Sequence, residues 1–133
     1  MKLYLLATFF LIMGCKSIPK AQQITIGSGG GFTNLWHKYT LSPNGDMHHY
    51  VSNYDTTFLE KKITQSLTKK MFEQVEALKL DSLAMDEPGN ISYFIEFSEG
   101  EKFKYKIQWN NQNKAPDSVL TFFEDFKALL KKE

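Results

Sequence analysis

Arginine is absent from this chain, and all 16 basic residues among its 133 are lysines. The planar fork with which arginine holds a phosphate or a carboxylate is therefore missing, which disfavours a nucleotide-processing enzyme. The 15 acidic residues nearly balance the lysines, and the formal net charge is +1. Because no overall field would draw the chain to a polyanion, we expect no nucleic-acid partner.

Cysteine is nearly absent too, and the single one, Cys15, follows an apolar run about 11 residues long. That run is too short to anchor the chain as a membrane-spanning helix. Lys2 before the run and the small Gly14 after it complete the pattern of a secretory signal peptide, which we expect to span residues 1–14 and to be removed. A lone cysteine at the cleavage point of an exported chain then needs an explanation.

The residues Ile12-Met13-Gly14-Cys15 resemble a bacterial lipobox. The resemblance implies that Cys15 is acylated and becomes the N-terminus of a lipoprotein anchored in a membrane of the cell envelope, on the extracytoplasmic side. The alternative is an ordinary signal peptide followed by a free thiol. Residues 15–22 are mostly polar and predict a lipidated tether, and residues 23–133 have the size of a single domain.

The first half of that domain is patterned for strands. Residues 23–26 alternate polar and apolar and predict a short strand that stops at Gly27. Residues 36–41 and 47–52 flank Pro43-Asn44-Gly45, whose residue types suit a tight turn. This loop length places Leu41 opposite Met47, Tyr39 opposite His49 and His37 opposite Val51 on one face of a hairpin. Residues 58–63 predict one more strand, although Glu60, Lys61 and Lys62 interrupt the alternation.

The second half holds two helical patterns and one clear hairpin. Apolar residues recur at helical spacing in residues 65–79 and again from Pro116 to Leu130. Between them, the strands 91–97 and 103–109 each alternate apolar and polar residues. We expect Phe97 opposite Phe103, with the turn at Glu99-Gly100-Glu101, and a shared buried face. Its members are Tyr93, Ile95, Phe97, Phe103, Tyr105, Ile107 and Trp109.

This order of elements predicts an α+β fold. The simplest packing is an antiparallel β-sheet, made of a meander plus a hairpin, with two α-helices packed on one face. Lys102, Lys104 and Lys106 then form a positive row on the solvent face, which either discourages aggregation at the sheet edge or attracts an acidic partner.

Residues that could carry chemistry are few. The sequence has three histidines, of which His37 and His49 fall diagonally on one strand face while His48 points to the other. Two histidines do not make a metal site, and no third ligand stands at a suitable spacing, so we expect no metal and no other cofactor. No serine lies in a nucleophile elbow and no carboxylate pair is placed for acid/base work, so an enzyme is not expected.

The glycine-rich stretch Gly29-Gly30-Gly31-Phe32-Thr33-Asn34 is the candidate binding site. It leads into a strand rather than a helix, so it is not a phosphate-binding loop. One interpretation is a partner-docking loop in which Phe32 is an aromatic anchor. The alternative is that Phe32 folds back and plugs the core.

The order of features resembles emfourin, a family of small bacterial inhibitors of thermolysin-like metallopeptidases. The resemblance rests on Gly30-Gly31-Phe32-Thr33-Asn34, on Leu78-Lys79-Leu80-Asp81-Ser82-Leu83 at a helix end, on Tyr93-Phe94-Ile95-Glu96-Phe97, and on Ala115-Pro116 before the terminal helix. Asn34 stands where the family has glycine, and asparagine tolerates the left-handed conformation.

The resemblance implies a protein-binding module without catalytic activity, whose target would be an exported metallopeptidase. The alternative is a small-ligand carrier or structural envelope lipoprotein with an apolar cleft between the sheet and the helices.

Overall fold

The computed structural model describes residue 18 and residues 21–131. The predicted signal peptide 1–14, the acylation site Cys15 and most of the tether 15–22 lie outside the described residues. Of that tether, Ile18 packs against the core, and Gln22 is the first residue of a strand.

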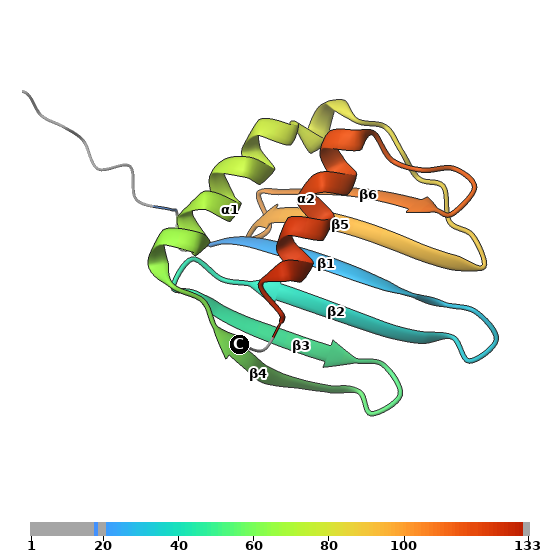
Figure 1. The fold of residues 1–133 in the computed structure, drawn as a ribbon, viewed down its shortest axis with the longest axis horizontal. Helices are drawn as coiled ribbons and strands as arrows, with labels where there is room; N and C mark the ends of the chain where they lie inside the picture. The colour runs from blue at the N-terminus through green and yellow to red at the C-terminus, as the bar shows by residue number, and fades with distance from the viewer. Residues whose placement is uncertain (1–17, 19–20, 132–133) are drawn as a thin grey trace, which may run out of the picture.

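The chain forms one antiparallel six-stranded sheet, covered on one face by two helices (Figure 1). The strands lie in the order β4-β3-β2-β1-β5-β6, so the predicted meander and hairpin join through pairing of β5 with β1. The predicted α+β class is confirmed. In chain order the strands are β1 (Gln22–Gly30), β2 (Leu35–Leu41), β3 (Asp46–Val51), β4 (Thr56–Lys62), β5 (Ile91–Glu99) and β6 (Phe103–Asn110).

Two helices complete the fold, α1 (Gln65–Leu78) and α2 (Asp117–Ala128). The hydroxyl of Thr64 caps α1 by accepting from the backbone N–H of Leu67, and Lys79 ends it in the left-handed conformation with φ 50°. A short 3-10 turn, Leu80–Ser82, follows. Both helices bury most of the apolar stripes expected of them, through Phe72 on α1 and Phe126 on α2 among others, but Leu67 in the first turn of α1 is 42% exposed.

The hairpin of β2 and β3 has the predicted register, with Leu41 opposite Met47 and Tyr39 opposite His49. The three-residue loop fits because Gly45 adopts φ 92°, a value that favours glycine. The carbonyl oxygen of Gly45 also accepts from the N–H of Ile63, which ties this turn to the segment before α1.

The register predicted for β5 and β6 is wrong by two residues. Phe97 lies opposite Tyr105, not Phe103, and the turn is Gly100-Glu101-Lys102. A slip of two keeps every side chain on its face, so alternation alone could not exclude it. The observed register aligns Ile95 with Ile107, and both side chains are fully buried.

The faces of this hairpin are as predicted, but burial is not uniform. Tyr105 is 37% exposed, whereas Ile107 on the same face of the same outermost strand is fully buried. In contrast, Phe94 is only 2% exposed although it lies on the face of the sheet without helices.

The first strand is longer than predicted and runs on to Gly30. Its glycines pair with both neighbours, since Gly29 lies opposite Trp36 on β2 and opposite Ser92 on β5. Glycine is normally unfavourable in a strand interior, which is why the sequence predicted a loop here.

Candidate functional site

The predicted glycine-rich loop is in part a strand. Gly29 and Gly30 end β1, and only Gly31, Phe32, Thr33 and Asn34 form the turn to β2. Gly31 and Asn34 have φ 71° and 50°, so Asn34 adopts the left-handed conformation that asparagine tolerates. The backbone N–H of Asn34 donates to the carbonyl of Gly31 at 3.2 Å, which closes the turn.

Close approach explains why the strand ends in glycine. A Cβ on Gly29 would lie 2.4 Å from Cδ2 of Trp36, and one on Gly30 would lie 2.5 Å from the carbonyl oxygen of Asn90. The Trp36 indole N–H in turn donates to the side chain of Asn34 at 3.1 Å. Because these positions are glycines, Trp36 and Asn90 can pack closely against the end of β1 and support the turn, whose tip projects from the sheet.

Phe32 at that tip is fully exposed, with a relative accessibility of 107%. The alternative in which Phe32 plugs the core is wrong. Two further large apolar side chains are exposed beside this end of the sheet, Tyr54 at 74% and Ile91 at 44%. We call the turn 31–34, the turn 52–55 and the segment 89–91 together the hairpin end.

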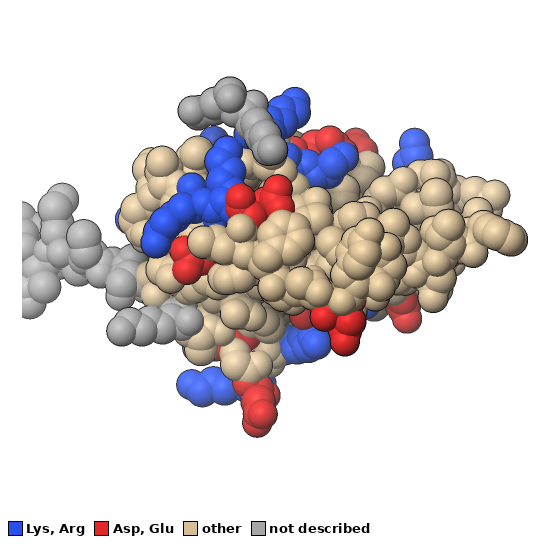
Figure 2. Space-filling model, turned by 90° about the horizontal axis from the view of Figure 1, so that it is seen from below, with Lys and Arg blue, Asp and Glu red and all other residues tan. Residues whose placement is uncertain are grey.

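The pairing of the strands brings the three segments of the hairpin end to one side. Gly30 lies opposite Ile91 at the start of β5, and Val51, just before the second turn, lies opposite His37 on β2. The turn 31–34 and the segment 89–91 contain no charged residue, and Asp55 is the one charge in the turn 52–55. Figure 2 shows the outermost part of the molecule, at the right, in tan and without a charged side chain in this view.

The hairpin end and the start of the domain lie at opposite ends of the sheet (Figure 1). β1 begins at Gln22, and its nine residues lead directly to Gly30. At a rise of about 3.3 Å per residue, its two ends are roughly 26 Å apart.

A second candidate site, a cluster of polar side chains, lies on the helix-covered face of the sheet. Nδ1 of His37 is 2.9 Å from Nε2 of His49, and Nδ1 of His49 is 3.3 Å from a carboxylate oxygen of Glu60. The ring of His49 is held between Tyr39, stacked at 4.1 Å, and Phe58, edge-on at 5.0 Å. His49 is 9% exposed, so the neighbouring side chains enclose it almost completely.

Glu60 joins this cluster through a β-bulge. Met47 pairs with Lys61 whereas His48 pairs with Leu59, so Glu60 is the extra residue between them. Burial and the nearby charge of Glu60 both raise the pKa of Tyr39. The diagonal placement of His37 and His49 followed from the sequence, but the bulge that adds Glu60 carried no signal in the pattern.

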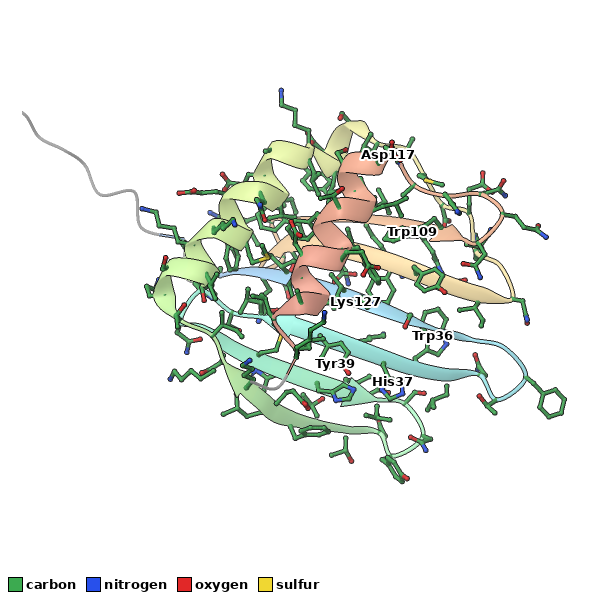
Figure 3. The ribbon with its side chains drawn as sticks, viewed as in Figure 1. Trp36, His37, Tyr39, Trp109, Asp117 and Lys127 are labelled. Carbon is green, nitrogen blue, oxygen red and sulfur yellow. The ribbon has the colours of Figure 1, made fainter. Side chains whose placement is uncertain are left out.

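A cavity of about 590 Å³ lies next to His37, between the C-terminal half of α2 and strands β1, β2 and β5. Figure 3 shows Lys127 on α2 near Tyr39 and His37 on β2. Sequence reasoning named neither Ser28 nor Tyr93 as site residues. Both line the cavity, with Ile26, Gly27, His37, Tyr39, Phe123, Glu124, Lys127, Ala128, Leu130 and Lys131.

Of the predicted lysine row, Lys104 and Lys106 lie on β6 and on the helix-free face, whereas Lys102 belongs to the turn before this strand. Lys104 pairs with Glu96 at 3.5 Å, and the Lys106 ammonium lies 4.6 Å from the centre of the Phe94 ring. Lys104 and Lys106 therefore both interact with side chains of the neighbouring strand β5.

Within residues 18 and 21–131, no three histidine, cysteine, aspartate or glutamate side chains gather as a metal site. No helix in the same part of the chain is long and apolar enough to cross a membrane. No protein-family model and no curated protein sequence matches the chain.

Proposed function

We propose that this chain is a lipid-anchored protein of the cell envelope that binds another protein through the hairpin end. The observation that carries the proposal is the full exposure of Phe32 at the tip of a braced turn. An exposed aromatic on an ordered support loses little conformational freedom on binding, which is the usual character of a hot spot. Tyr54 and Ile91 supply further apolar area on either side.

The charge pattern supports the same surface. Cores of protein interfaces are depleted in charged residues and enriched in aromatic ones. The hairpin end has this composition, whereas lysines and carboxylates are distributed over the rest of the domain. The domain starts at the opposite end of the sheet, so an anchor at Cys15 would leave Phe32 directed away from the membrane.

As the partner we propose an exported metallopeptidase of the thermolysin type, which the chain would inhibit without catalysing any reaction itself. This part of the proposal rests on the emfourin-like order of Gly30-Gly31-Phe32-Thr33-Asn34 and the later elements. A turn of four residues that projects from two paired strands has the shape to enter the cleft of a peptidase.

The experiment measures peptidase activity against increasing amounts of the purified, acylated chain. Stoichiometric inhibition, with the chain recovered intact, is the expected result. A panel of thermolysin-like enzymes that all remain fully active would reject the peptidase as partner. Crosslinking from position 32 in native envelopes then tests the wider proposal, which fails if position 32 captures no protein while the chain is folded.

A further inference from the structure

The cavity beside His37 owes its space to one small residue in the floor of the sheet. On the helix-covered face, Ser28 of β1 lies between His37 on β2 and Tyr93 on β5. In the neighbouring row, Ile26 lies between Tyr39 and Ile95 and fills the equivalent position. The serine therefore leaves a hollow beneath α2 that an isoleucine would close.

The size and walls of the hollow suit a small planar molecule. Its volume, about 590 Å³, falls within the ordinary range for small-molecule sites, roughly 300–1,000 Å³. Three aromatic rings line it, from Tyr39, Tyr93 and Phe123. Tyr93 and Phe123 meet edge-to-face at 6.0 Å, so they form a corner against which a further ring can pack.

The charged groups of the lining have a positive excess. Lys127 and Lys131 contribute two ammonium groups and Glu124 one carboxylate, which lies 3.4 Å from Lys127. Because Glu124 pairs with Lys127, the lining has one more ammonium group than it has carboxylates, and a carboxylate ligand would balance this charge. Lysine suits this task as a flexible point charge at a partly open mouth.

With both rings neutral, the hydrogen bonds behind His37 determine which of its ring nitrogens acts as an acceptor. The Glu60 carboxylate can only accept, so Nδ1 of neutral His49 carries the proton and Nε2 accepts. Nδ1 of neutral His37 must then donate to His49, and Nε2 of His37 is left as an acceptor. A ligand hydroxyl would therefore donate to Nε2 of His37.

We propose that this cavity binds a small aromatic carboxylate that carries a hydroxyl group on its ring. The ring packs between Tyr93, Phe123 and Tyr39, the carboxylate meets Lys127 or Lys131, and the hydroxyl donates to His37. The site lies on the helix-covered face and shares no residue with the hairpin end. This proposal can therefore be confirmed or rejected independently of the proposed protein partner.

The test compares three probe molecules on the purified full chain, by calorimetry and by ligand-observed NMR. The probes are 4-hydroxybenzoate, benzoate, which lacks the hydroxyl, and 4-hydroxybenzyl alcohol, which lacks the charge. We expect 4-hydroxybenzoate to bind about three- to tenfold more tightly than benzoate, the range of one neutral hydrogen bond. The uncharged probe should also bind more weakly. Equal affinity of all three, or no binding of any at millimolar concentration, overturns the proposal.

Two variants place the binding in this cavity. Ser28→Leu fills the hollow and should abolish binding while the thermal melt stays as high as that of the parent chain. His37→Phe keeps a ring but removes the acceptor, so 4-hydroxybenzoate and benzoate should then bind alike. His48→Phe, on the other face of the sheet, is the matched control and should bind as the parent does. Undiminished binding by folded Ser28→Leu rejects the site, and the comparison of probes on the parent chain decides the hydroxyl contact if His37→Phe unfolds.

Discussion

The ring of Phe94 on β5 lies directly against the backbone of Gly27 on β1. A Cβ added to Gly27 would lie 2.3 Å from Cε1 of that ring and 2.8 Å from the carbonyl oxygen of His37. Phe94 thereby becomes almost fully buried on a face that no helix covers. Two lysines complete the cover, with the ammonium of Lys106 at 4.6 Å and that of Lys38 at 5.9 Å from the ring centre.

The first prediction is that Gly27→Ala destabilises the domain. The added methyl group must displace Phe94 and strain the strand, and overpacking of this kind costs about 1–3 kcal/mol. Urea denaturation of Gly27→Ala, Phe94→Ala and the double variant measures the effect. Because removing the ring relieves part of the clash, the double variant should lose less than the sum of the two single losses. Strict additivity would show that the ring and the glycine do not interact.

The same contact explains why the residue pattern alone predicts a first strand that is too short. Closely spaced glycines are typical of a loop, but Gly27 and Gly29 pair with both neighbouring strands and leave room for the rings of Phe94 and Trp36. By contrast, the register of β2 and β3 could be predicted, because Pro43-Asn44-Gly45 determines the loop length locally. Residues that meet only through tertiary pairing, such as Phe94 on Gly27, leave no periodic signal along the chain.

The candidate sites divide in the same way. The turn around Phe32 could be predicted from local residue types, and His37 and His49 from the hairpin register. Ile91 joins the hairpin end only because β5 pairs with β1, and Glu60 joins the histidines only through the bulge opposite Met47. The alternation of apolar and polar residues predicts neither the pairing of β5 with β1 nor the position of the bulge, because both depend on which strands become neighbours in the sheet.

The second prediction concerns the register of β5 and β6. Ile95 and Ile107 lie opposite each other with no exposed area, so changing either one to alanine should cost about 2–5 kcal/mol. The double variant should lose less free energy of unfolding than the two single variants together, because the two cavities adjoin each other. Lys102→Ala in the adjacent turn is the control and should change the free energy of unfolding by less than about 0.5 kcal/mol. Losses that small for the isoleucines would show that the buried face is wrongly assigned.

The third prediction is a loss of stability at alkaline pH that depends on Tyr39. Burial, and next the charge of Glu60, raise the pKa of Tyr39 above the ordinary value of 10.0. The folded state thus holds the phenol proton more tightly than the unfolded state does. This contribution is complete below pH 10 and is lost as the pH rises through the raised pKa.

Tyr39→Phe should therefore flatten the decline in the free energy of unfolding above pH 10. Denaturation of the parent chain and the variant is compared at pH 7 and at several alkaline values. The difference at pH 7 serves as the internal control for lost packing and for the missing hydroxyl. If both proteins decline with the same slope, Tyr39 does not carry the linkage.

The fourth prediction is that Cys15 carries a lipid. Cys15→Ser should leave the precursor unprocessed or move the protein from the membrane fraction to the soluble fraction. Intact-mass measurement of the parent chain should find cleavage before Cys15 and the added mass of acyl chains. Ser17→Ala, two residues further on, is the matched control and should stay in the membrane fraction. An unmodified thiol at Cys15 in the mature protein would contradict the prediction.

The last prediction is that Phe32 is the energetic centre of the hairpin end. Truncation of a hot-spot aromatic commonly costs 2 kcal/mol or more, so Phe32→Ala should weaken inhibition of the target peptidase by roughly thirtyfold. Gly31→Val should act in the same direction, because φ 71° at that position is unfavourable for a branched side chain and the turn would be displaced. Phe32 is fully exposed and lies outside the core, so Phe32→Ala should change the melting temperature little. Tyr105→Ala removes an aromatic side chain of similar size from the outermost strand, and this control should inhibit as strongly as the parent chain. Equal inhibition by Phe32→Ala and Tyr105→Ala would mean that the peptidase contacts another surface.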